Sequence, residues 1–404
     1  MSTRHSSLAL LRQFRQTVWA MLLGEFLSRI TYFMAWPFVI IILNQQMGES
    51  AFSVGLLLGV SAAISAVMGI YIGYLSDKFG RKVMLVAGCL LMAVCFLMLT
   101  FADGFWWFFV VMALMGLGQP AIEVCAKAII SDSLADRQVR EFALYLRYFL
   151  INVSGAIGGI IGLIVSLNSP DAIFIATTAT YLGYLLWVSI LLSNHRTTSS
   201  DNLPNFVGML GVIRQDGVFL YLLLANFLMI MVYAQLGTTL PQIISLSGIE
   251  QVAQFIMMIY IINFLAVIIF QFPLLSLLKA FSASRRAQIG LGVMLSSQLI
   301  FMVMDMSSVW AWGVAVFILS IGEAIVIPTI SVNIDELAKP ELRGSYFGAA
   351  NLSEFGMSLG AVLGGFVIGT LSDTAYFAIT SLACVACVLI YQKIVRYQAK
   401  LRHF

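Results

Sequence analysis

Long apolar stretches alternate with short polar breaks along nearly the whole chain. A helix that crosses the hydrocarbon core of a membrane needs about 20 predominantly apolar residues. The pattern therefore predicts an all-α membrane protein with twelve transmembrane helices. The twelve stretches cover approximately residues 17–43, 52–76, 83–102, 105–131, 142–166, 172–193, 218–245, 252–278, 287–304, 309–333, 344–370 and 374–394.

The composition agrees with a surface that faces lipid. Hydrophobic residues make up 61% of the 404 residues and charged residues only 10%. A soluble domain has about 45–50% apolar and about 25% charged residues. The shortage of charge indicates hydrocarbon contact, because a charged side chain at a helix centre costs roughly 2.5–3.5 kcal/mol. The first apolar stretch is too long for the core of a signal peptide, so we expect it to be a permanent span.

The widest polar interruption runs from residue 194 to residue 216 and separates six stretches from six. It predicts an N-terminal six-helix bundle at 1–193, a cytoplasmic linker at 194–216 and a C-terminal six-helix bundle at 217–404. Asp103 and Asp305 each precede a pair of tryptophans at the start of the fourth and tenth stretches. These matching positions favour two pseudo-symmetric halves, although a belt of interfacial tryptophans explains them equally well.

The charges predict the orientation of the chain. Every Lys and Arg outside the apolar stretches lies at a terminus or in a loop on the side of both termini. Short basic loops stay cytoplasmic, so we expect an inner-membrane, multi-pass protein with both termini in the cytoplasm. The opposite loops contain no basic residue but one acid each: Glu49, Asp103, Asp171, Glu250, Asp305 and Asp373.

The sequence does not favour an enzyme. It has no cluster of nucleophile and base or of metal ligands, and Cys384 and Cys387 lie in an apolar stretch where cysteine serves as small packing material. It also lacks the Gly-rich phosphate-binding motif through which ATP would drive transport directly. We expect no cofactor, no metal and no nucleic-acid partner.

The segment from Gly73 to Lys82 reads G-Y-L-S-D-K-F-G-R-K and joins the second and third stretches. It closely resembles G-x-L-x-D-r-x-G-r-k, the loop signature of the major facilitator superfamily. A glycine allows close helix packing or a tight turn, and Asp77 at a helix end can meet Arg81 or the N-terminus of another helix. The resemblance implies twelve spans, transport by alternating access, and a latch that closes the cytoplasmic side. It assigns the latch to Gly73, Asp77, Gly80, Arg81 and Lys82.

Three shorter motifs resemble particular branches of this superfamily. Residues 25–33 read E-F-L-S-R-I-T-Y-F and are similar to E-x-x-E-R-x-x-Y-Y of proton-dependent oligopeptide transporters, with Ser28 in place of the second acid. Residues 322–328 read G-E-A-I-V-I-P, which is similar to both those transporters and some bacterial proton-driven multidrug exporters. Residues 154–159 keep the paired glycines, but not the proline, of the drug:proton antiporter motif G-P-x-x-G-G. None of these matches decides the substrate.

Ionisable residues inside the apolar stretches mark candidate functional sites, because burying charge in a membrane is costly. Glu25 with Arg29, and Glu123 with Lys127, have the i, i+4 spacing of a favourable pair on one helix face. Such pairs are either structural or part of a substrate site. Arg147 could hold a substrate carboxylate, bridge to a glutamate across the bundle, or extend to the cytoplasmic headgroups. The candidate substrate-binding residues are Arg29, Tyr32, Glu123, Lys127, Arg147, Asn226 and Tyr233.

Glu323 and Glu354 have no basic residue within one turn on their own helices. Burial disfavours the charged form of an unpartnered carboxylate, so such a group is poised to bind and release a proton. The three histidines all lie in predicted cytoplasmic segments, which leaves carboxylates as the proton carriers. We expect proton coupling at Glu323, Glu354 and Glu25, which all reach the middle of the membrane, where secondary transporters place their sites.

The sequence thus predicts a proton-coupled secondary transporter, with a small-molecule substrate, protons and the lipid bilayer as partners, acting as a monomer. Our first choice of role is export of amphipathic, cationic or neutral drugs, for which Met- and Phe-rich spans offer adaptable contacts. The alternative is transport of peptides or peptide-like metabolites such as siderophores, whose charged ends Glu25 with Arg29, Lys127 and Arg147 would hold. A membrane sensor is less favoured, because the chain has no soluble output domain.

Overall fold

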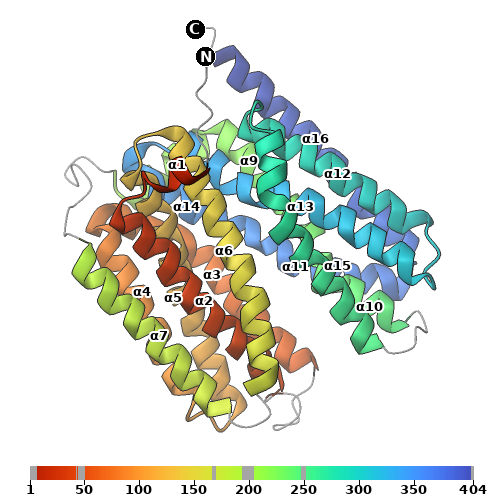
Figure 1. Cartoon of the computed structure of the whole chain (residues 1–404), viewed down its shortest axis with the longest axis horizontal. Helices are drawn as coiled ribbons and strands as arrows, with labels where there is room; N and C mark the ends of the chain where they lie inside the picture. Colours follow the sequence, from red (N-terminus) through yellow and green to blue (C-terminus); the bar gives the residue numbers. More distant parts are fainter. Residues whose placement is uncertain are drawn as a thin grey trace. The chain divides into compact units, whose positions relative to one another are not determined.

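The computed structural model describes residues 7–41, 43, 51–165, 170–192, 204–246 and 252–401, and the regular elements within them are helices. They form two compact units (Figure 1). The first unit comprises Met1–Gly211 with Leu337–Leu352, and the second comprises Val212–Glu336 with Ser353–Phe404. Residues 337–352, which the sequence analysis put in the second half, thus group with the first unit. Residues 194–203 of the expected linker lie outside the described ranges, and α8 (Phe206–Gln215) occupies most of the remainder.

In the first unit, six long helices match the first six apolar stretches. Helix α2 packs against α6 and α7, α4 packs against α5 and α7, and α3 packs against α5 and α14. The elements of this unit are α1 (Ser7–Leu11), α2 (Gln16–Ile41), α3 (Ala51–Phe79), α4 (Arg81–Leu99), α5 (Phe105–Ser133), α6 (Arg137–Val165), α7 (Pro170–Leu191), the 3₁₀ helix η4 (Pro340–Leu342) and α14 (Arg343–Ala350).

In the second unit, α9 packs against α15 and α16, and α12 packs against α16. Its elements are α9 (Gly217–Tyr233), η3 (Ala234–Leu236), α10 (Thr239–Leu246), α11 (Val252–Leu277), α12 (Ala283–Val303), α13 (Val309–Leu337), η5 (Asn351–Glu354), α15 (Phe355–Thr370) and α16 (Asp373–Leu401).

Two of the expected continuous spans are broken. The seventh is interrupted between α9 and α10 by η3, and the eleventh is interrupted between α14 and α15 by η5. At the first break, both the Gly237 amide and the Thr238 hydroxyl donate to the Ala234 carbonyl oxygen, at 3.1 and 2.8 Å. Such local donors satisfy backbone groups that leave the regular helical pattern inside a membrane.

The prediction of a multi-pass helical membrane protein is confirmed. In the described part of the chain, eleven helices or helix runs are long and apolar enough to cross a membrane, and α2 adds a further helix of 26 residues. Many large apolar side chains point outward, including Ile190 at 84% and Trp310 at 85% exposure. Such exposure suits a surface that is covered by lipid.

Glycines on one face of α15 bring it into backbone contact with the broken seventh span. A Cβ atom at Gly356 would lie 2.3 Å from the Phe227 carbonyl oxygen, and one at Gly360 would lie 2.6 Å from that of Met231. A Cβ at Gly364 would meet the Thr239 hydroxyl at 2.0 Å. Small residues let membrane helices approach this closely, so α15 holds α9 and α10 on both sides of the break.

Candidate functional site

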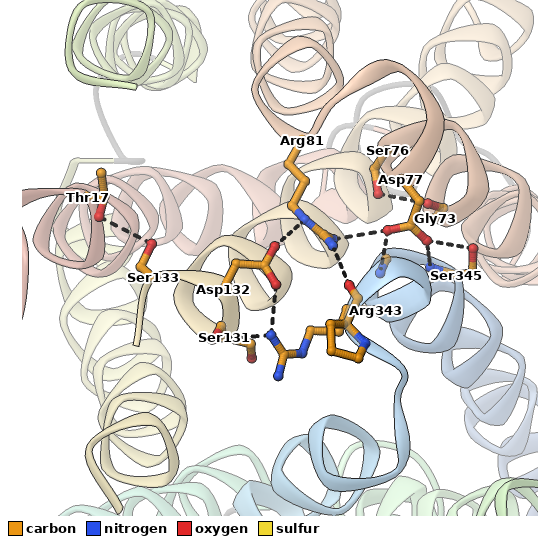
Figure 2. Close-up of polar contacts among 12 residues, drawn as sticks. Thr17, Gly73, Ser76, Asp77, Arg81, Ser131, Asp132, Ser133, Arg343 and Ser345 are labelled. Atoms are coloured by element: carbon orange, nitrogen blue, oxygen red, sulfur yellow. Dashed lines mark hydrogen bonds and ion pairs between the residues drawn. The ribbon is translucent and has the colours of Figure 1, made fainter. Parts of the chain in front are cut away.

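The loop between α3 and α4 is bound to the N-terminus of α14 through Asp77 (Figure 2). The Asp77 carboxylate accepts hydrogen bonds from the backbone amides of Gly344 at 2.9 Å and Ser345 at 2.7 Å, and from the Ser345 hydroxyl at 2.7 Å. The first amides of a helix lack partners within the helix and favour negative charge. Arg81 lies 3.2 Å from the same carboxylate. Both partners expected for Asp77 are therefore present.

A second carboxylate extends this network. Asp132, at the end of α5, forms ion pairs with Arg81 at 2.5 Å and with Arg343 at 2.9 Å, as Figure 2 shows. Arg81 thus links two acids, and Asp132 links two arginines. The sequence analysis missed Asp132 and Arg343, although both interrupt apolar sequence at helix ends where a charged residue needs a partner.

The glycines of the loop motif have different structural roles. Gly80 adopts a φ of 102°, a conformation that favours glycine, and starts α4. A Cβ at Gly73 would lie 2.2 Å from the Gly344 carbonyl oxygen, so Gly73 allows α3 and α14 to touch. Lys82 instead points to α7, where its ammonium donates to the Leu192 carbonyl oxygen at 2.5 Å.

Inside the first unit, Glu25 on α2 forms a two-point ion pair with Arg147 on α6. The Arg147 Nε donates to Glu25 Oε2 at 2.7 Å, and its Nη2 donates to Oε1. The two side chains are only 2% and 8% exposed. Of the three possibilities considered for Arg147, the structure shows the bridge to a glutamate across the bundle. The expected pairing of Glu25 with Arg29 is wrong, because a two-point contact to the neighbouring helix is the stronger interaction.

Arg29 pairs instead with Glu123 on α5. Glu123 also receives a hydrogen bond from Gln119 at 3.0 Å and lies 3.8 Å from the Lys127 ammonium, the pairing expected from their spacing. The Arg29 guanidinium lies 5.5 Å from the centre of the Tyr32 ring. Two cations thus share one carboxylate in a cluster whose Glu123 side chain is 27% exposed.

In the second unit, Glu323 on α13 is fully buried. The Asn263 side-chain amide on α11 donates to Glu323 Oε2 at 2.5 Å and to the Ser320 hydroxyl at 3.0 Å. The Tyr233 phenol at the end of α9 is also hydrogen-bonded to Glu323. The expectation of an unpartnered carboxylate is therefore wrong for Glu323. Its partners come from helices that are distant in sequence, and they are neutral groups.

The sequence around Glu323 supports this distinction. No Lys, Arg or His occurs between Arg214 and Lys279, or between Arg286 and Lys339. These intervals contain α9, α11 and α13 except for their ends. The helices that supply the Tyr233, Asn263 and Ser320 contacts thus carry no basic residue at the depth of Glu323.

Glu354 and Asn226 differ from the expectation in other ways. Glu354 closes η5 and is exposed, since the span is broken at this point, so it is not the buried carboxylate that the apolar pattern suggested. It remains near the Glu323 group, because its charge acts on Tyr233. Asn226 is buried, and its side-chain oxygen accepts a hydrogen bond from Tyr391 on α16 at 3.1 Å. This contact joins two helices and is a packing interaction.

Apolar spanning helices with buried charge networks in both units define a polytopic membrane transporter. A family model described as Major Facilitator Superfamily matches residues 21–355, and the chain belongs to this superfamily. It is a transporter and not an enzyme, as the named relatives and structural neighbours also indicate. The expected fold, with two six-helix bundles, is the fold of this superfamily.

Two curated relatives cover most of the chain. An "Uncharacterized MFS-type transporter YqjV" from Bacillus subtilis is 28% identical over 354 residues, which is 87% of this chain and 86% of the relative. The "Multidrug resistance protein MdtH" of Yersinia pestis (strain Pestoides F) is 27% identical over 361 residues, covering 88% and 86% of the two chains.

Solved structures show the same fold at lower identity. The human organic anion transporter MFSD10 superimposes with a TM-score of 0.74 at 15% identity, covering 93% of this chain and 99% of that chain. The Escherichia coli fucose:proton symporter FucP superimposes with a TM-score of 0.72 at 16% identity, covering 94% and 98%.

Proposed function

We propose that this protein is a proton-coupled secondary transporter that exports amphipathic small molecules by alternating access. It works as a monomer in the inner membrane, with both termini in the cytoplasm. The relatives named multidrug resistance proteins support drug-like substrates. The concentration of basic residues on the side of both termini supports the orientation.

The environment of Glu323 is the observation that carries the proton coupling. A buried carboxylate held by an amide and a phenol can accept a proton and become neutral without breaking an ion pair. Glu25 and Glu123 differ, because each is bound to an arginine. Protonating either would leave a partly or fully buried arginine without its counter-charge, which is strongly unfavourable. We therefore assign proton exchange to Glu323 before Glu25.

Proton binding at Glu323 gives a physical reason for coupling. The carboxylate changes by one full charge inside the second unit, so its proton can favour one conformation over another. A ligand or proton shifts a conformational equilibrium only by its difference in affinity for the two states. A buried site that is sensitive to one charge provides such a difference.

The test uses purified protein in liposomes with an acidic interior, and it measures uptake of ethidium, a lipophilic cation. We expect uptake to depend on the pH gradient in the wild type and to lose that dependence in Glu323→Gln. Glu341→Gln, at an exposed position in η4, is the matched control and should behave as the wild type. Gradient-dependent uptake by Glu323→Gln would refute proton coupling at this residue.

A second candidate is transport of an anionic or peptide-like substrate. Its support is the cluster in which Arg29 and Lys127 share the partly exposed carboxylate of Glu123. Two cations beside one acid favour an incoming carboxylate. Arg147 contributes less to this reading than the sequence suggested, because Glu25 already occupies its guanidinium. Uptake of a dipeptide that is inhibited in Lys127→Met, with ethidium uptake unchanged, would favour this candidate.

A further inference from the structure

Tyr233 lies between a buried carboxylate and an exposed one. Its phenol is hydrogen-bonded to Glu323, and the charge of Glu354 acts on the same phenol. Glu323 is fully buried, Tyr233 is half-buried, and Glu354 is exposed. We propose that Tyr233 relays protons between Glu354 and Glu323. This inference rests on the proposed proton coupling and names the path by which the proton reaches the buried group.

Burial makes a relay necessary. Glu323 has 0% exposure, so water does not reach its carboxylate in this conformation, and a side chain must carry the proton. The Asn263 amide, its other described donor, cannot serve, because an amide N–H does not act as an acid near neutral pH. A phenol both donates and accepts a proton. Tyr233 is thus the partner of Glu323 with suitable chemistry.

The step is a concerted transfer in which Tyr233 stays neutral. Protonated Glu354 gives its proton to the Tyr233 oxygen while the Tyr233 hydroxyl proton moves to Glu323. At the end Glu354 is a carboxylate, Glu323 is a carboxylic acid, and the net charge of the three residues is unchanged. The transfer takes place when Glu354 and the Tyr233 oxygen are joined by a hydrogen bond, directly or through one water.

The remaining neighbours have defined roles in this scheme. Asn263 on α11 is held by Ser320 and keeps the Glu323 carboxylate oriented toward α9 and α11. Tyr260 on α11 is the other titratable group that acts on Tyr233. It is therefore a matched control, since it offers a phenol in the same region that is not described as bonded to Glu323.

The experiment compares Tyr233→Phe with Tyr260→Phe in liposomes. Uptake driven by an inside-acidic pH gradient requires net proton transfer, whereas exchange of labelled for unlabelled ethidium without a gradient does not. We expect Tyr233→Phe to lower gradient-driven uptake by roughly tenfold or more, in line with the loss of a proton-transferring group, and to keep the exchange rate. Tyr260→Phe should keep both activities. A purely structural role of Tyr233 would lower both rates together.

The possible results separate this inference from the proposed function. If Glu323→Gln loses gradient dependence but Tyr233→Phe keeps wild-type uptake, the relay is wrong and proton coupling stands. If Glu323→Gln keeps gradient dependence, the proposed proton coupling fails and the relay fails with it. Should Tyr233→Phe not fold, Glu354→Gln tests the same path at an exposed position. Loss of uptake with retained exchange, partly restored in Glu354→Asp, supports the relay, and wild-type uptake overturns it.

Discussion

Replacing Arg147 by methionine should strongly destabilise the protein, because it leaves the Glu25 carboxylate buried without its partner. Glu25 is 2% exposed, and both of its oxygens accept from the Arg147 guanidinium. Removing one partner of a buried ion pair costs about 3–5 kcal/mol, whereas replacing both by apolar residues is often neutral or stabilising. The double variant Glu25→Leu/Arg147→Met should therefore be close to the wild type.

The difference is large enough to measure by thermal unfolding in detergent. For a unit of about 150–250 residues, 1 kcal/mol corresponds to roughly 2–4 °C in Tm, so Arg147→Met should unfold roughly 6–20 °C below the wild type. Double-mutant cycles isolate the interaction of the pair. A single variant as stable as the wild type, or a double variant as unstable as the single one, would refute a tight buried pair.

Three further predictions follow from other contacts. Gly344→Ala should lower stability by about 1–3 kcal/mol, because the added Cβ would lie 2.6 Å from Asp77 Oδ1, while Gly59→Ala, which meets nothing within 4 Å, should not; thermal unfolding compares the two. Asp132→Asn should also lower Tm, since two arginines lose a charged partner, and an unchanged Tm would contradict the network. The five cysteines are buried, so a hydrophilic maleimide should label them only after unfolding in SDS, and labelling of the native protein would show that this packing is wrong.

The helices could be predicted because hydrocarbon imposes a length and a composition on each span. The stretch at 105–131 corresponds to α5 (Phe105–Ser133), and the stretch at 309–333 corresponds to α13 (Val309–Leu337). The breaks at η3 and η5 were not predictable from apolarity, because both segments remain apolar overall. They depend on local donors such as Thr238 and on contacts with a neighbouring helix.

The charged residues could be found in the sequence, but their partners could not. Spacing along one helix suggested that Glu25 pairs with Arg29, whereas its actual partner, Arg147, is 122 positions away. The same limit applies to Glu323, whose donor Asn263 is 60 positions away and carries no charge that would draw attention to it. Periodicity reports which face of a helix a residue occupies, but tertiary packing decides what that face meets.

The motif between α3 and α4 was more informative, because it encodes both sides of a contact. The spacing of Asp77 and Arg81 fixes their ion pair on one turn, and Gly73 indicates a close neighbour. The motif did not reveal which helix N-terminus Asp77 would meet. The structure shows that it is α14, whose residues Gly344 and Ser345 supply the amides.

The exchange of protons for substrate at Glu323 is tested most directly by measuring proton movement itself. Liposomes containing the protein and a trapped pH-sensitive dye, with no imposed gradient, receive ethidium on the outside. Antiport predicts that ethidium entry drives protons out, so the interior pH rises with the wild type and with Glu341→Gln, and does not change with Glu323→Gln. Ethidium entry into wild-type vesicles without any change of interior pH, or an equal pH rise with Glu323→Gln, would contradict the account.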